Sequence, residues 1–216
     1  TIVHTLNNPN AYDTSAGDRF GESVAISGNY AIVGARGEKD ADGLNSGKAY
    51  IFNVTTGLPV HTLDNPDAYN TGADDYFGSS VAISGDYAIV GAYGEDDSDG
   101  ILSGKAYIYN VNTGARVHTL DNPDAYEIGQ FDRFGYSVAI SGDYAIVGAY
   151  AEKDADGSAS GKAYIFNVIT GLPVHTLDNP NPFGTSQSDY FGWTVAISGD
   201  YAIVGATGED DADGDD

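Results

Sequence analysis

Short runs of alternating apolar and polar residues divide the chain into strand-sized pieces. Residues 80–84 form a β-branched, alternating run, a two-residue Gly85-Asp86 turn follows, and residues 87–92 continue as a second run. Residues 105–111 and 116–120 are a third and a fourth run of similar length. Period-two runs separated by Gly-containing turns predict antiparallel strands. Because no segment shows an apolar period of 3.6, we predict four strands and no helix for this stretch.

The same pattern recurs four times, which makes the repeat the main fact about the sequence. The Phe-Gly pair that precedes each first strand returns every 57 residues without insertion or deletion, at Phe20, Phe77, Phe134 and Phe191. The copies run over residues 1–57, 58–114, 115–171 and 172–216, and the last copy lacks its final twelve residues. We treat residues 1–216 as a single repeat domain.

Both faces of the second strand are apolar, which indicates stacked sheets. In residues 87–92, one face carries Ala88, Val90 and Ala92 and the other carries Tyr87 and Ile89. In a sheet with one face exposed to water, apolar and polar residues would alternate along each strand instead. Four short strands in about 57 residues match a propeller blade. We therefore predict an all-β fold of tandem four-stranded antiparallel blades, a β-propeller with four blades or a part of a larger propeller or array.

The stretch from Phe134 to Ala149, and its three counterparts, resembles the FG-GAP repeat of integrin-α-like propellers. Gly161–Phe166 and His175–Leu177 resemble the bacterial and archaeal surface-protein version of that repeat. The resemblance implies a surface protein built of propeller blades, commonly seven in this family. Integrin-type repeats carry a calcium loop between the first and second strands, where this chain has only a tight turn. A calcium site must therefore be argued from this chain's own residues.

The net charge of the chain limits the classes of partner that we expect. The net charge of −23 repels nucleic acid and anionic membranes and attracts cations. The chain has no cysteine and no apolar run of membrane-spanning length. We expect neither nucleic-acid binding nor membrane insertion, and we expect an extracellular or cell-surface location.

An acidic loop between the second and third strands carries alternate carboxylates followed by glycine in every copy. This arrangement lets a short loop place several oxygens around one hard cation. We predict one Ca²⁺ per loop, held by Glu38, Asp40, Asp42, Glu95, Asp97, Asp99, Glu152, Asp154, Asp156, Glu209, Asp211 and Asp213. The alternative is a solvated charge run that serves solubility. The bidentate Glu that ends an EF-hand loop is missing, so we expect modest affinity.

Other polar residues favour structural roles. Each of the four histidines lies in a Val-His-Thr-Leu run, and equivalent positions in separate blades cannot converge on one metal. A lysine follows each of the first three acidic loops, at Lys48, Lys105 and Lys162. We expect these lysines to form salt bridges to the loops. Trp193 replaces Glu22 of the first copy and indicates either a binding spot or terminal packing. Catalysis needs an asymmetric cluster of different groups, so the near-identical copies predict no enzyme.

The ends of the sequence suggest assembly. The chain begins with a fourth strand and stops after a second one, which leaves sheet edges open to a further strand. We expect residues 1–6 to complete a blade, either with this chain's own last half-blade or with that of another copy. The leading interpretation is a structural or adhesive module whose partners are copies of itself. The alternative is a lectin-like or integrin-like propeller that binds glycan or surface protein through tips such as Tyr69 and Tyr126.

Overall fold

The computed structural model is built from antiparallel β-sheets, as the alternation predicts. It describes residues 1–9, 17–39, 44–66, 73–96, 101–123, 131–153, 159–180 and 188–209, and these contain no helix. Within them lie the strands β1 Val24–Ser27, β2 Tyr30–Ala35, β3 Lys48–Asn53, β4 Leu58–Asp64, β5 Ser80–Ser84, β6 Tyr87–Ala92, β7 Lys105–Asn110, β8 Arg116–Leu120, β9 Ser137–Ser141, β10 Tyr144–Ala149, β11 Lys162–Asn167, β12 Pro173–Asp178, β13 Phe191–Ser198 and β14 Tyr201–Ala206.

The strands pair in chain order, so each sheet is a simple meander. We call β1–β4 blade 1, β5–β8 blade 2, β9–β12 blade 3, and β13–β14 the terminal hairpin. The first turn of each unit is tight: Ser84 pairs directly with Tyr87, and Gly85 between them has a positive φ of 56°. Glycine tolerates this conformation without steric cost. The predicted four-strand unit is therefore confirmed in blades 1 to 3, and the described part of the last repeat contributes two strands.

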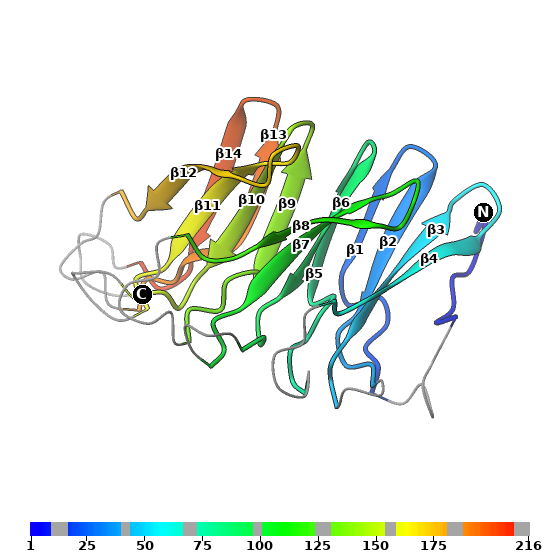
Figure 1. Ribbon diagram of the computed structural model, residues 1–216, viewed down its shortest axis with the longest axis horizontal. Helices are drawn as coiled ribbons and strands as arrows, with labels where there is room; N and C mark the ends of the chain where they lie inside the picture. Colours follow the sequence, from blue (N-terminus) through cyan, green and yellow to red (C-terminus); the bar gives the residue numbers. More distant parts are fainter. Residues whose placement is uncertain are drawn as a thin grey trace.

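The blades follow one another face to face along the molecule, with the first strands β1, β5, β9 and β13 adjacent in turn (Figure 1). Apolar side chains from two blades form one core between them. Between blades 1 and 2, Ile51 and Leu63 pack with Phe77, Val81 and Tyr107 in a single buried cluster. This burial explains why both faces of the second strand must be apolar, and it confirms a propeller-like arrangement of tandem blades.

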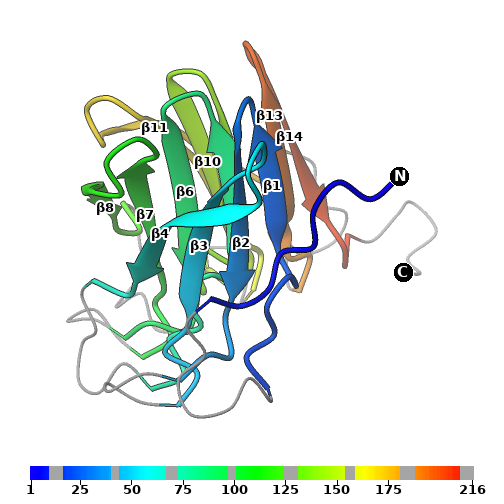
Figure 2. The ribbon, with the colours of Figure 1, turned by 90° about the vertical axis from the view of Figure 1, so that its right-hand side faces the viewer.

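The residues before blade 1 occupy the place that the fourth strand of a preceding blade would take. Residues 1–9 form no strand, yet Leu6 packs against the cluster that contains Tyr50 and Phe52. They lie beside blade 1, at the opposite end of the row from the terminal hairpin (Figures 1 and 2). Of the two alternatives for residues 1–6, completion of this chain's own last half-blade is therefore wrong: among the described residues β14 pairs with β13 alone, and the stacked blades separate residues 1–9 from the terminal hairpin (Figure 1).

Candidate functional site

The first carboxylate of each acidic loop is buried inside the fold. Glu38, Glu95 and Glu152 have no exposed surface, and Glu209 of the last repeat is half-buried. A turn bond from the Glu38 amide to the Ala35 carbonyl, at 3.0 Å, directs the chain inward directly after β2. The other predicted calcium ligands lie outside the described residues; these are Asp40, Asp42, Asp97, Asp99, Asp154, Asp156, Asp211 and Asp213.

Each buried glutamate accepts hydrogen bonds from a tyrosine of the third strand. The Tyr164 hydroxyl lies 2.7 and 2.8 Å from the two carboxylate oxygens of Glu152. Asn122 donates to Glu152 Oε2 at 2.9 Å and to Asp132 Oδ2 at 3.1 Å. Lys162 Nζ lies 3.5 Å from Glu152 Oε1. We call this arrangement the acid network; it holds two carboxylates, an amide, a phenol and an ammonium group.

The acid network joins one blade to the next. Asn122 follows β8 of blade 2, whereas the other four groups lie before β9, after β10 or in β11 of blade 3; these are Asp132, Glu152, Lys162 and Tyr164. The equivalent groups are present around Glu38, where Asn8 donates to Glu38 and to Asp18, and around Glu95, where Tyr107 donates to both carboxylate oxygens. Each network therefore joins a sheet to the asparagine of the segment that precedes it.

Burial controls the electrostatics of this network. The pKa of Glu152 is raised to about 8; desolvation is the main cause, the Tyr164 hydrogen bond opposes it, and the neighbouring Asp132 adds to it. Desolvation likewise raises the pKa of Glu38 and of Asp18. Burial and the Glu38 carboxylate raise the pKa of Tyr50, which therefore stays a hydrogen-bond donor. A buried carboxylate is tolerated when donors surround it.

This geometry gives the four glutamates a structural role beside their predicted role as cation ligands. The described carboxylates accept bonds from tyrosine or asparagine donors. Within the described ranges, no group of three or more acidic or histidine side chains has the geometry of a metal site. The sequence could have indicated the network, because Glu and Tyr recur twelve residues apart in three copies. The predicted calcium loops stay a prediction.

The lysines and histidines take the structural roles that the sequence favours. Lys105 and Lys162 lie 3.8 and 3.5 Å from the loop glutamates, and Lys48 pairs with Asp64. His118 Nε2 lies 3.1 Å from the carbonyl oxygen of Ile169, in a turn of the next blade. His4 makes the equivalent 3.0 Å contact with Thr55. The lysine ion pairs lie within one blade, whereas these two histidine contacts join a blade to the segment before it.

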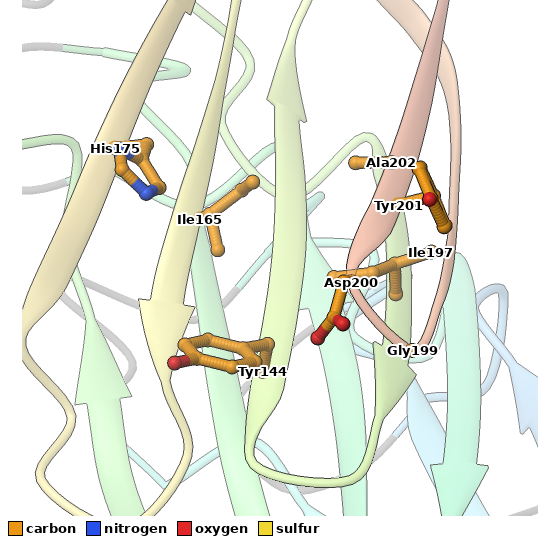
Figure 3. Close-up of a pocket in the computed structure, with 8 residues that line it drawn as sticks. All are labelled: Tyr144, Ile165, His175, Ile197, Gly199, Asp200, Tyr201 and Ala202. Carbon is orange, nitrogen blue, oxygen red and sulfur yellow. The ribbon is translucent and has the colours of Figure 1, made fainter.

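A groove opens where the terminal hairpin meets blade 3 (Figure 3). It is lined by Tyr144, Ile165, His175, Ile197, Gly199, Asp200, Tyr201 and Ala202. In the interfaces between complete blades, the residue directly after the third strand of the following blade joins the core: Val111 after β7 and Val168 after β11 are fully buried. The groove therefore has the shape and lining of a place for a third strand.

The meander order, the apolar faces and the contacts between successive sheets define a propeller-type repeat protein. A model of the FG-GAP repeat matches residues 10–52, 68–109, 125–166 and 184–216, and the chain belongs to this family. Among solved structures, the fold is similar to that in the crystal structure of the computationally designed Ika4 protein. The TM-score is 0.56 at 12% identity, and the match covers 97% of this chain and 94% of that one. The comparison with curated proteins found no match.

Proposed function

We propose that this chain is a non-enzymatic, extracellular structural module that assembles with further copies of itself through its two end faces. The observation that carries the proposal is a difference in exposure between equivalent residues. Val81 and Ile83 of blade 2 are 6% and 7% exposed, whereas their counterparts Val24 and Ile26 of blade 1 are 64% and 69% exposed. In the interior of the row, an apolar surface of the preceding blade covers the equivalent side chains. Val24 and Ile26 have no such surface over them within the described residues.

The terminal hairpin, at the opposite end of the row, has an apolar surface of the kind that covers the first strands in the interior. Ile32, Ile89 and Ile146 are fully buried against the next blade, but Ile203 of the terminal hairpin is 70% exposed. The face of blade 1 and the back of the hairpin thus repeat the two halves of an internal interface. Two different surfaces that fit each other give head-to-tail contacts, which close into rings or extend into filaments.

The edge of β14 supports the same proposal. β2, β6 and β10 each pair on both sides, whereas within the part of the chain that the structure describes β14 pairs with β13 alone. An unpaired edge beside an apolar groove accepts an added strand through backbone hydrogen bonds.

A structural role also accounts for the polar groups. The acids and asparagines recur in all four repeats and the tyrosines in three, and they bond to one another, which supports a non-enzymatic function. The net charge of −23 keeps such a surface soluble and favours Ca²⁺ at the acidic loops, where we propose that it reduces self-repulsion.

Sedimentation velocity and negative-stain imaging over a range of concentrations test the assembly. We expect rings or filaments from the native chain, and assembly at least ten-fold weaker for the double variant V24E/I26E. Leu172→Glu is the matched control, because Leu172 is also 64% exposed but lies away from the end faces. Monomers at all concentrations, or equal effects of the double variant and the control, would overturn the proposal.

A further inference from the structure

Three positions per repeat vary strongly within an otherwise closely repeated framework. They are the residue before Phe-Gly, the residue after Phe-Gly, and the residue after the second strand. In chain order these positions hold Arg19, Tyr76, Arg133 and Tyr190; Glu22, Ser79, Tyr136 and Trp193; and Arg36, Tyr93, Tyr150 and Thr207. Their neighbours Phe, Gly and Ala do not change between copies.

The fold brings most of these variable side chains together as one row, which we call the aromatic row. Tyr76 stacks on Tyr93 with ring centroids 5.1 Å apart, and Tyr93 lies 5.3 Å from Tyr136. Tyr136 in turn contacts Tyr150 at 4.5 Å and Trp193 at 4.9 Å. The row therefore crosses from the second repeat to the fourth, and its members are partly exposed.

Charged planar groups continue the row into the first repeat. The Arg36 guanidinium lies 5.5 Å from the centre of the Tyr76 ring, donates to the Tyr93 hydroxyl at 3.2 Å, and pairs with Glu22 at 2.9 Å. The Arg133 guanidinium lies over the Tyr93 ring, also at 5.5 Å. The hydrogen bond from Arg36 lowers the pKa of Glu22, so both members of the ion pair are charged.

A cleft lies at the first part of this row. Its lining includes Glu22, Arg36, Ser79, Tyr93 and Tyr136. The cleft thus combines a carboxylate, a guanidinium, a hydroxyl and aromatic rings within one concave surface. Concave sites with a few fixed polar groups and aromatic walls are typical of small-ligand binding.

We propose that this cleft binds uncharged pyranose sugars of a polysaccharide or glycan. The apolar C–H face of a pyranose packs on the π-face of an aromatic ring, whose quadrupole attracts the weakly positive hydrogens. Each sugar hydroxyl can both donate and accept a hydrogen bond. Two adjacent hydroxyls can therefore donate to a carboxylate and accept from a guanidinium at the same time. The Glu22–Arg36 pair supplies both functions in one place. The remaining rings extend the surface for further sugar units.

Charge favours a neutral sugar over an acidic one. Arg36 is already matched by Glu22 at 2.9 Å, so the cleft does not need an anion to balance it. The chain as a whole carries −23, which repels polyanions. This proposal does not depend on assembly, because its residues are separate from Val24, Ile26 and the groove beside β14.

Trp193 is the chain's one tryptophan and contacts Tyr136, which provides an intrinsic fluorescence signal for the test. Neutral gluco-, manno- and galacto-oligosaccharides of four to six units are titrated into the native chain, with calorimetry as a second measurement. We expect saturable binding by at least one of them. We expect Tyr136→Ala and Arg36→Gln each to weaken it ten-fold or more without changing the circular dichroism spectrum.

Tyr201→Ala is the control, because Tyr201 is 83% exposed and lines the groove of the terminal hairpin instead. Its binding should equal that of the native chain. No binding of any neutral oligosaccharide at millimolar concentration would overturn the proposal. So would binding that the two cleft variants leave unchanged, or salt-sensitive binding of anionic oligosaccharides alone.

Discussion

Gly91 at the end of the second strand of blade 2 lies directly against the backbone of Gly135 in the next repeat. A Cβ added to Gly91 would lie 2.0 Å from the Gly135 carbonyl oxygen. The same relationship joins Gly34 to Gly78 and Gly148 to Gly192. The two glycines of the repeat motif are thus partners across each contact between repeats, where only a hydrogen fits.

We therefore predict that Gly91→Ala is strongly destabilising. Gly91 does not have a positive φ, so the penalty is steric and arises from backbone that cannot move away. Overpacking of this kind costs about 1–3 kcal/mol or more. Gly205→Ala is the matched control, since the added Cβ meets the Thr194 side chain at 2.7 Å and no backbone atom within 3 Å. Urea denaturation should show a far smaller change for the control; equal losses would contradict the contact.

Tyr164→Phe tests the acid network. The substitution removes the hydroxyl that lies 2.7 and 2.8 Å from the oxygens of the buried Glu152. Losing one of the hydrogen bonds to a buried acceptor costs about 1–3 kcal/mol. We expect a lower melting temperature, whereas Tyr201→Phe on the exposed surface should leave it unchanged. A loss no larger than in Tyr201→Phe would mean that the network does not stabilise the fold.

The raised pKa of Glu152 predicts a dependence of stability on pH. Its pKa moves from an ordinary 4.5 to about 8 in the folded chain, so the folded state binds more protons between these values. The contribution of this group to the free energy of unfolding is therefore fully present below about 4.5 and is lost as the pH rises through about 8.

Glu152→Gln removes this titration. Measured in chelator, the stability of the variant relative to the native chain should rise steadily from pH 5 to pH 8, because the native chain loses stability over that range. The other acidic groups are common to both proteins and cancel in the difference. A difference that does not vary with pH would show that Glu152 titrates normally.

Substitution of the loop aspartates tests the predicted calcium sites. We expect D97N/D99N to lower the melting temperature in calcium, because it removes proposed ligands. In chelator the variant should match or slightly exceed the native chain, because it relieves repulsion in a chain of charge −23. Asp143→Asn, in an exposed hairpin turn, is the control for loss of charge alone. Equal losses in calcium and in chelator would contradict the site.

The sequence was sufficient for the fold because strand, turn and repeat signals agree in every copy. The alternation in residues 80–92 and the Gly85-Asp86 turn predict the hairpin that the structure has. The candidate site was harder to predict than the fold, because the spacing of residues along the sequence does not show which side chains are buried. Glu152 is predicted as a loop ligand beside Asp154, and the spacing did not show that the fold also places it against Tyr164. The aromatic row was missed because Tyr136 and Trp193 are 57 residues apart and meet only when the blades stack.

The groove beside β14 predicts binding of an isolated third strand. Residues 160–171 of this chain, supplied as a synthetic peptide, carry Tyr164, Phe166 and Val168, which are buried where blade 3 is complete. Backbone bonds to the free edge of β14 and burial of these side chains should give saturable binding, which isothermal calorimetry measures. A peptide with all three replaced by Asn keeps the length but loses the apolar contacts, and it should bind at least ten-fold more weakly. Equal affinity of the two peptides would mean that the groove does not select the strand, and the case for strand addition at this end would fail.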